Sequence, residues 1–221
     1  MEKITLEKIK ADENIRALID GANNNLKEMG YTEHGLRHVG YVSRTTANIL
    51  RELGYDDRTV ELGAITGWMH DIGNAVNRKN HGLSGAALAF QLLDNMGMDM
   101  REISTVIGAI GNHEEETGVP VSAVSAALII ADKTDVRRNR VREKPKANFD
   151  KHDRVNYAVT DAKLKINVEK KTIALNLQID PKICSMYEYF DIFLGRMMMC
   201  RGAADIFDAS FKLTANGSKV L

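Results

Sequence analysis

Helical periodicity over the first 140 residues is the feature that most limits the folds open to this chain. Apolar residues recur at the spacing of one helix face, and Gly30 and Gly54 mark the ends of the first two segments. The pattern predicts helices over residues 15–29, 33–53, 56–70, 81–96, 99–112 and 120–132. We therefore expect a mostly α fold in which these helices form a bundle.

The pattern changes after residue 145. Apolar and polar residues alternate over 164–168 and again over 173–179, which predicts a β-hairpin across a short Glu-Lys-Lys turn. A long helix is expected over 185–207, and a last strand over 211–220. A small C-terminal hairpin and helix thus follow the helical part.

This change of pattern suggests the organisation of the chain. We expect a helical unit over residues 1–145 and a hairpin-plus-helix appendage over 146–221, packed on the same domain. The segment 137–158 is rich in Arg, Lys and Asp and is expected to be an exposed connection. The methionine run 197–199 is explained by core packing or by a homodimer.

Charge and hydropathy restrict the partners. Thirty Lys and Arg balance thirty Asp and Glu in 221 residues, so no net field favours nucleic acid or an anionic membrane, and a small-molecule ligand is expected. No apolar run approaches the roughly 20 residues of a membrane span, and no signal peptide is recognised, so a cytoplasmic protein is expected. Cys184 and Cys200 are too few for a disulfide framework.

The histidines point to a metal site. Five of the six lie between residues 34 and 113, and His70 is followed at once by Asp71 at the end of an apolar helix. At such an end both side chains can turn toward one point, and a carboxylate can bridge two cations. Imidazole and carboxylate together suit Mn, Fe, Zn, Co or Ni better than Ca. The absence of a nearby Cys argues against a structural zinc site.

The order of these residues resembles the HD-domain metal-dependent phosphohydrolases. That family is characterised by a His, a His-Asp doublet and a distant Asp, which here are His38, His70 with Asp71, and Asp132. The resemblance covers residues 34–140, with His38 placed 32 residues before His70 and the final Asp in the segment LIIADKTD. It implies an HD-type helical bundle.

Two further histidines, His81 and His113, extend the resemblance to the two-metal branch. This branch includes bacterial dinucleoside tetraphosphate hydrolases and the HD-GYP cyclic-dinucleotide phosphodiesterases. The resemblance implies that one metal is held by His38, His70, Asp71 and Asp132, and that Asp71 bridges to a second metal held by His81 and His113. Fe or Mn is expected first, with Zn, Ni, Co and Mg as alternatives. Asn74, Asn112 and the segment 117–119 depart from the HD-GYP pattern, which favours the dinucleoside tetraphosphate type.

The expected activity is hydrolysis of a nucleotide or a related phosphate ester or anhydride by a metal-activated water. The chain has no G-x-x-x-x-G-K-[ST] loop and no G-x-S-x-G elbow, so P-loop chemistry and serine hydrolysis lack support. The alternatives are a cyclic-dinucleotide phosphodiesterase, a metal-bound nucleotide sensor without turnover, and a purely structural helical module.

Other residues have candidate roles beside the ligands. Besides Asp71, the expected catalytic residues are Glu114, as a general acid or an acceptor that orients an imidazole, and Lys133, as a phosphate contact. The expected substrate-binding residues are His34, Arg78, Lys79, Arg137 and Arg138. For each a plainer role stays open: a solvated surface charge, or for His34 a hydrogen bond at the helix start. His152 and the basic residues Arg140, Arg142, Lys144 and Lys146 are expected to be solvated.

Overall fold

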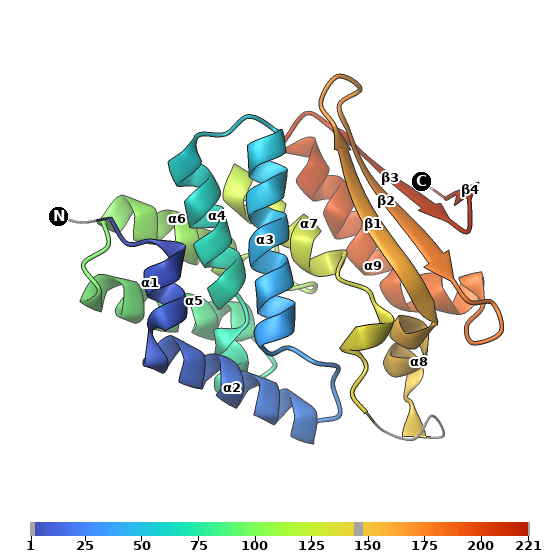
Figure 1. Cartoon of the computed structure of the whole chain (residues 1–221), viewed down its shortest axis with the longest axis horizontal. Coiled ribbons are helices and arrows are strands. Elements are labelled where there is room, and N and C mark those ends of the chain that lie inside the picture. Colours follow the sequence, from blue (N-terminus) through green and yellow to red (C-terminus); the bar gives the residue numbers. More distant parts are fainter. Residues whose placement is uncertain (1–2, 144–147, 221) are drawn as a thin grey trace.

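The computed structural model describes residues 3–143 and 148–220. These residues form nine α-helices, two short 3-10 helices and four strands (Figure 1). The expectation of a mostly helical fold with a small C-terminal sheet is confirmed. Lys144, Lys146 and the expected boundary between residues 145 and 146 lie outside the described residues.

Side-chain caps set the starts of most helices in the first part of the chain. Asp12, Asp56, Asp99 and Ser122 each accept a hydrogen bond from a backbone N–H in the first turn of the helix that follows. The helices are α1 (Leu6–Ala11), α2 (Glu13–Glu28), α3 (Leu36–Glu52), α4 (Asp57–Met69), α5 (His81–Asn95), α6 (Met100–Gly111) and α7 (Ala123–Lys133), with the 3-10 helix η1 (Ile72–Ala75) after α4. The helix expected from residue 33 begins three residues later, with Gly35 as its N-cap.

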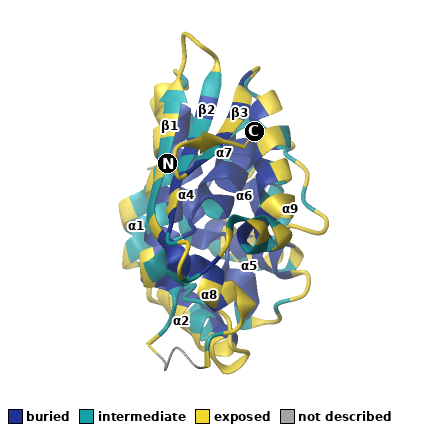
Figure 2. Ribbon diagram, turned by 90° about the vertical axis from the view of Figure 1, so that its right-hand side faces the viewer, coloured by how far each residue is buried: buried dark blue, intermediate teal, exposed yellow. Residues whose placement is uncertain are grey.

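Helix α7 lies at the centre of the molecule. Residues 124–131 are all buried, and Figure 2 shows α4, α6 and α7 as the buried interior. One apolar cluster joins α7 to α3 and to the C-terminal part of the chain, and a second joins α1, α2, α4, α5 and α6. The C-terminal residues therefore share a core with the helical part, because α7 packs against α9 (Met186–Asp205).

The sheet has the strand order β1-β2-β3-β4. Its strands are β1 (Val159–Asn167), β2 (Thr172–Ile179), β3 (Ser210–Ala215) and β4 (Ser218–Lys219). β1 and β2 pair antiparallel, as the predicted hairpin requires, whereas β2 and β3 pair parallel. A parallel pair needs a crossover, and α9 makes it, packing between α7 and the sheet (Figure 1).

Two details of the sequence prediction are wrong. The expected exposed connection 137–158 contains the 3-10 helix η2 (Arg138–Arg140) and α8 (Lys151–Ala158), and it buries Arg140, Val155 and Ala158. The expected last strand is two strands, because Asn216 and Gly217 have φ values of 51° and 81° and form a tight turn between them.

Candidate metal centre

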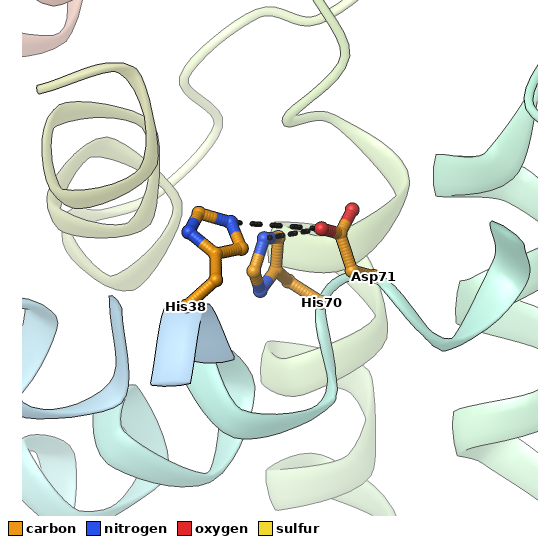
Figure 3. Close-up of side chains that lie close together, drawn as sticks. All are labelled: His38, His70 and Asp71. Atoms are coloured by element: carbon orange, nitrogen blue, oxygen red, sulfur yellow. Dashed lines mark ion pairs between the residues drawn. The ribbon is translucent and has the colours of Figure 1, made fainter. Parts of the chain in front are cut away.

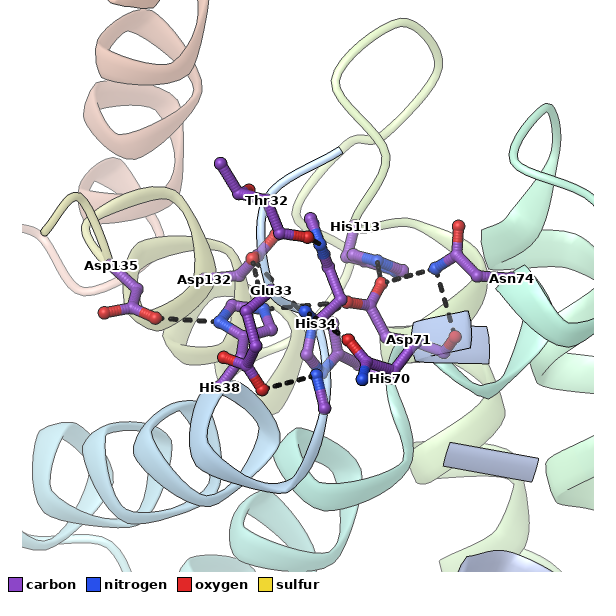
Figure 4. A network of polar contacts seen from close by, with 12 residues as sticks. Thr32, Glu33, His34, His38, His70, Asp71, Asn74, His113, Asp132 and Asp135 are labelled. Atoms are coloured by element: carbon purple, nitrogen blue, oxygen red, sulfur yellow. Dashed lines mark hydrogen bonds and ion pairs between the residues drawn. The ribbon is translucent and has the colours of Figure 1, made fainter. Parts of the chain in front are cut away.

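The six expected ligands come from helix ends that meet at one end of the bundle. They are His38 in the first turn of α3, His70 at the C-cap of α4, Asp71 just after it, His81 at the first position of α5, His113 just beyond α6, and Asp132 near the end of α7. Five of them are buried and Asp132 is nearly so. Figure 4 shows five of these side chains turned toward one another around Asp71.

Two glycines allow this convergence. A Cβ on Gly67 would lie 2.7 Å from the backbone N and Cα of Ser43, so Gly67 lets α4 approach α3 closely. A Cβ on Gly73 would lie 2.0 Å from the carbonyl oxygen of His81 and 2.5 Å from the N of Gly85, so Gly73 lets η1 touch the start of α5. The ligands of α3, α4 and α5 depend on these close contacts.

A hydrogen bond from Nδ1 fixes the orientation of each of the four ligand imidazoles. Each Nδ1 atom donates to a fixed acceptor: His38 to Asp135 Oδ2 (2.8 Å), His70 to the Gly67 carbonyl (2.9 Å), His81 to the Arg78 carbonyl (3.0 Å) and His113 to the Ile110 carbonyl (2.6 Å). In a neutral imidazole, donation from Nδ1 leaves Nε2 with a free lone pair. Four lone pairs therefore face the centre, as in metal sites whose ligands are oriented by outer partners.

One group of ligand atoms lies between α3, α4 and α7. Asp71 Oδ2 is 3.6 Å from His38 Nε2 and 3.3 Å from His70 Nε2, contacts drawn in Figure 3. Asp132 Oδ1 is 3.4 Å from His38 Nε2 and 3.8 Å from His70 Nε2. Donors bound to one ion at about 2.1 Å lie roughly 3.0 to 3.4 Å apart, so these four atoms fit around a single cation after small shifts.

A second group uses the other oxygen of Asp71. Asp71 Oδ1 is 3.5 Å from His81 Nε2 and 3.9 Å from His113 Nε2, and the two Nε2 atoms are 3.1 Å apart. Both Nε2 atoms carry lone pairs, so without a shared proton or a cation they repel. Asp71 therefore faces one ligand group with each oxygen, the arrangement of a bridging carboxylate.

The donor set fits metal ions. His38 Nε2, His70 Nε2 and Asp71 Oδ2 are buried and have no hydrogen-bond partner among the described residues. Such groups are costly when unpaired, and all three face the same point (Figure 3). In three sets of residues the ligand atoms all lie within 4.8 Å of one another: His38 with His70 and Asp71, His70 with His113 and Asp132, and Asp71 with His81 and His113. These buried His and Asp groups could hold a metal ion.

The electrostatics favour cations as well. Burial would raise the pKa of Asp71, but the neighbouring His70 and His113 hold it well below its usual range. Burial would likewise raise the pKa of Asp132, yet the charge of Lys133 and a hydrogen bond with His38 lower it strongly. Both carboxylates are thus ionised at neutral pH.

The pKa values of the ligand imidazoles shift in two directions. Burial lowers the pKa of His113, and burial together with the charge of His113 lowers the pKa of His81 to about 4. Burial would also lower the pKa of His70, but the facing carboxylates of Asp71 and Asp132 raise it instead. The two carboxylates that face His70 thus favour a positive charge at this point, which a proton on His70 can supply. A bound cation would neutralise the same two carboxylates.

Four residues hold the ligands in place. Asn74 Nδ2 donates to Asp71 Oδ1 (2.9 Å). Glu114 Oε1 accepts from the backbone N–H of His81 (3.2 Å) and also lies 2.6 Å from Nδ1 of that ring, beside the Arg78 carbonyl. Lys133 Nζ donates to Asp132 Oδ2 (2.6 Å), so only Oδ1 of Asp132 faces the histidines. Asp135 accepts from His38. Glu114 is therefore placed to orient an imidazole, the second of the two roles considered for it, and Lys133 contacts a ligand.

The expected substrate-binding residues separate into two sets. His34 and Arg78 line a cavity of about 260 Å³ beside the centre. Arg137 lies over the ring of Tyr41 and 3.3 Å from Asp135 Oδ1. Arg138 donates to the Tyr157 carbonyl and lies over that ring. Arg137 and Arg138 line a different cavity, and Lys79 is exposed outside the first one, so the structure brings only His34 and Arg78 beside the ligands.

His34 keeps one ring nitrogen available. Its Nδ1 donates to the Thr32 carbonyl (2.7 Å), which leaves Nε2 as an acceptor. Burial and the charge of Arg140 lower the pKa of His34 well below its ordinary value, so the ring is neutral at pH 7. His34 therefore accepts a proton or a hydrogen bond at the cavity rather than supplying charge.

Sequence reasoning did not single out Asn74, Asp135 or Arg196 for the site. Asn74 and Asp135 each follow a ligand by three residues, at Asp71 and Asp132, which is a usable signal because that spacing closes one turn. Arg196 lines the cavity and interrupts an apolar stretch of α9, the one sign of its role in the sequence. His152, expected to be solvated, is exposed and also borders the cavity.

A larger cavity lies elsewhere and does not compete with this site. Its volume is about 680 Å³, and it lies between α1, α3 and α4 beside Lys10, Arg44 and Trp68. It is lined by no histidine, so the cluster of oriented ligands and not cavity size identifies the candidate site.

Comparison with known proteins adds little on function. No family model matches the chain. One curated relative, "Uncharacterized protein MJ1020" of Methanocaldococcus jannaschii, is 26% identical over 136 aligned residues, which cover 52% of this chain and 52% of the relative. The chain thus spans about half the length of the relative that it matches. Within the described residues, no helix combines the length and the apolar character needed to cross a membrane.

Proposed function

We propose that this protein is an HD-type, metal-dependent phosphohydrolase that acts on a nucleotide or a related small phosphate ester or anhydride. The observation that carries the proposal is the position of Asp71, whose two oxygens face two separate groups of ligand atoms. A carboxylate so placed suits two cations held close together. Hydrolytic two-metal sites hold their ions roughly 3.5 to 4 Å apart to carry out phosphoryl chemistry.

The ligands divide between the two cations. His38, His70, Asp71 and Asp132 would hold one, and Asp71, His81 and His113 would hold the other. When bound, two such cations lower the pKa of a water and neutralise charge on the phosphoryl group and the leaving oxygen. Imidazole with carboxylate suits first-row transition metals, so we propose Fe or Mn first, with Zn, Co, Ni and Mg as alternatives.

The protein's own residues would position the reaction. Asp135, Asn74, Glu114 and Lys133 fix the ligands through the contacts described above, so the donor atoms need not reorganise when substrate arrives. His34 faces the cavity with a neutral acceptor nitrogen and is placed to take a proton or to orient a water. The substrate would enter by that cavity as a small molecule.

Product analysis tests the proposal. Purified protein loaded with Mn or Fe is incubated with dinucleoside polyphosphates, nucleoside mono- and triphosphates and cyclic dinucleotides, and the products are separated by chromatography. We expect cleavage of one class by the wild type, none by Asp71→Ala, and full activity in Asp94→Ala, which changes an exposed carboxylate of α5. Metal and nucleotide binding without any product would instead indicate a sensor.

A further inference from the structure

The cavity beside the metal centre is built by both halves of the chain. The loop before α3 contributes His34, and the loop after η1 contributes Arg78. Arg140 comes from η2, His152 from α8 and Arg196 from α9. The C-terminal part, which carries no motif of its own, therefore supplies a wall of this cavity.

Short contacts connect the cavity with the ligands. The His34 ring lies 5.3 Å from the His38 ring. Arg78 Nη1 donates to Asn74 Oδ1 (3.3 Å), and Asn74 in turn donates to Asp71 Oδ1 (2.9 Å). A molecule in the cavity would thus have its reacting group beside the metal ligands and the rest of its structure among the arginines.

The three arginines are not equivalent. Arg140 donates to the carbonyls of Glu33 and Asp135, so it contributes charge but few free donors. Arg78 lies over the Tyr31 ring, and among the described residues no carboxylate lies within ion-pair distance of it. Its guanidinium therefore keeps donors and an unmatched charge for a ligand.

Arg196 is held at the cavity by its own helix and by the loop that follows α6. Its guanidinium lies over the Phe193 ring at 4.6 Å, and its Nε atom is 2.6 Å from Glu115 Oε1. Among the described residues this buried Nε atom has no hydrogen bond of good geometry, and only 22% of the side chain is exposed. The Asp150 and Asp153 carboxylates also border the cavity, but both serve as the capping box of α8.

We propose that this cavity is a second anion subsite, in which Arg78 and Arg196 bind a phosphate group of the substrate other than the one that is cleaved. The proposal rests on the phosphohydrolase function and narrows its substrates. Guanidinium groups bind phosphate oxygens through paired, charge-assisted hydrogen bonds. At about 260 Å³ the cavity is smaller than the roughly 300 to 1,000 Å³ of sites for drug-sized ligands. Small molecules with two phosphate groups therefore fit it better than dinucleotides.

Calorimetric titration of the Mn-loaded protein with inorganic phosphate and with pyrophosphate tests the subsite. We expect the wild type to prefer pyrophosphate, and Arg78→Met and Arg196→Met each to weaken pyrophosphate binding about tenfold while phosphate binding changes little. Arg196→Lys keeps the charge and should retain part of the preference. Arg201→Met, an exposed arginine on the same helix, is the matched control and should behave as wild type.

Metal content and thermal unfolding are measured for each variant, which separates a lost subsite from a damaged fold. For any two-phosphate substrate that is turned over, we expect KM to rise in Arg78→Met and Arg196→Met while kcat stays near the wild-type value. Equal binding of phosphate and pyrophosphate by the wild type would overturn the subsite, as would unchanged pyrophosphate binding in both variants. The binding outcomes do not depend on turnover. The subsite proposal can therefore be refuted while the phosphohydrolase function stands, and the subsite can be supported even if no substrate is cleaved.

Discussion

The contact between Asp135 and His38 leads to a quantitative prediction about metal binding. Asp135 is 4% exposed, and its Oδ2 accepts from His38 Nδ1 at 2.8 Å. Burial would raise the pKa of Asp135, but the hydrogen bond with His38 and the charges of Arg140 and Arg137 lower it. The group is thus an anion that fixes the tautomer of His38 and strengthens its Nε2 as a donor to a cation.

The expected magnitude follows from the loss of that anion. Removing a residue that orients a metal-binding imidazole weakens metal affinity about 10- to 100-fold, which corresponds to about 1.4 to 2.7 kcal/mol. Asp135→Asn keeps an acceptor of the same shape and should fall at the lower end of this range. Asp135→Ala removes the acceptor and should fall at the upper end.

A competition titration with a chelating dye measures the effect. Zn²⁺ or Mn²⁺ is shared between the dye and the metal-free protein, and the dissociation constant is compared for wild type, Asp135→Asn, Asp135→Ala and the exposed control Asp94→Asn. Thermal unfolding of the metal-free proteins shows whether each variant is folded. Dissociation constants that stay within about threefold of wild type in both Asp135 variants would refute the reasoning.

Two further predictions concern the fold that carries the site. Gly73→Ala places a Cβ 2.0 Å from the His81 carbonyl oxygen, and because backbone cannot yield cheaply we expect a loss of about 3 kcal/mol in urea unfolding. The control Gly108→Ala, in an open position of α6, should gain about 0.5 to 1 kcal/mol, and similar losses in both variants would contradict the close contact. Hydrogen bonding to Arg58 lowers the pKa of Glu102, so this pair stabilises the fold above the unfolded-state pKa near 4.5 and loses its effect as the pH falls through the folded-state value. Glu102→Gln should therefore cost about 1 kcal/mol at pH 7, and this cost should shrink steadily as the pH falls below 4.5; a cost that does not change with pH would count against the pair.

The helices were predictable because their signals are local. Apolar spacing and capping side chains such as Asp56 and Ser122 act within one or two turns, so the sequence alone predicts α4 and α7. Helix α8 was missed because its charged residues suggested a loop. Its start does carry a local signal, the capping box of Asp150 and Asp153.

The candidate site likewise has residues that the sequence alone points to and contacts that depend on tertiary packing. The structure brings together all six ligands that the resemblance implies. The contact of Asp135 with His38 joins residues 97 positions apart, and Arg196 reaches the cavity only because α9 packs on α7. Arg137 and Arg138 lie near Asp132 in the sequence, but η2 turns them toward Tyr41 and Tyr157. Tertiary packing and not chain proximity decides which cations face the cavity.

Counting bound metal tests the central claim most directly. Metal-free protein is reconstituted with Fe or Mn without oxygen, freed of excess ion, and analysed for metal per chain by mass spectrometry. We predict about two ions per chain in wild type, about one in His113→Ala, and less than one in Asp71→Ala, because Asp71 belongs to both ligand groups. One ion or fewer in wild type, with no change in His113→Ala, would contradict a two-metal centre bridged by Asp71.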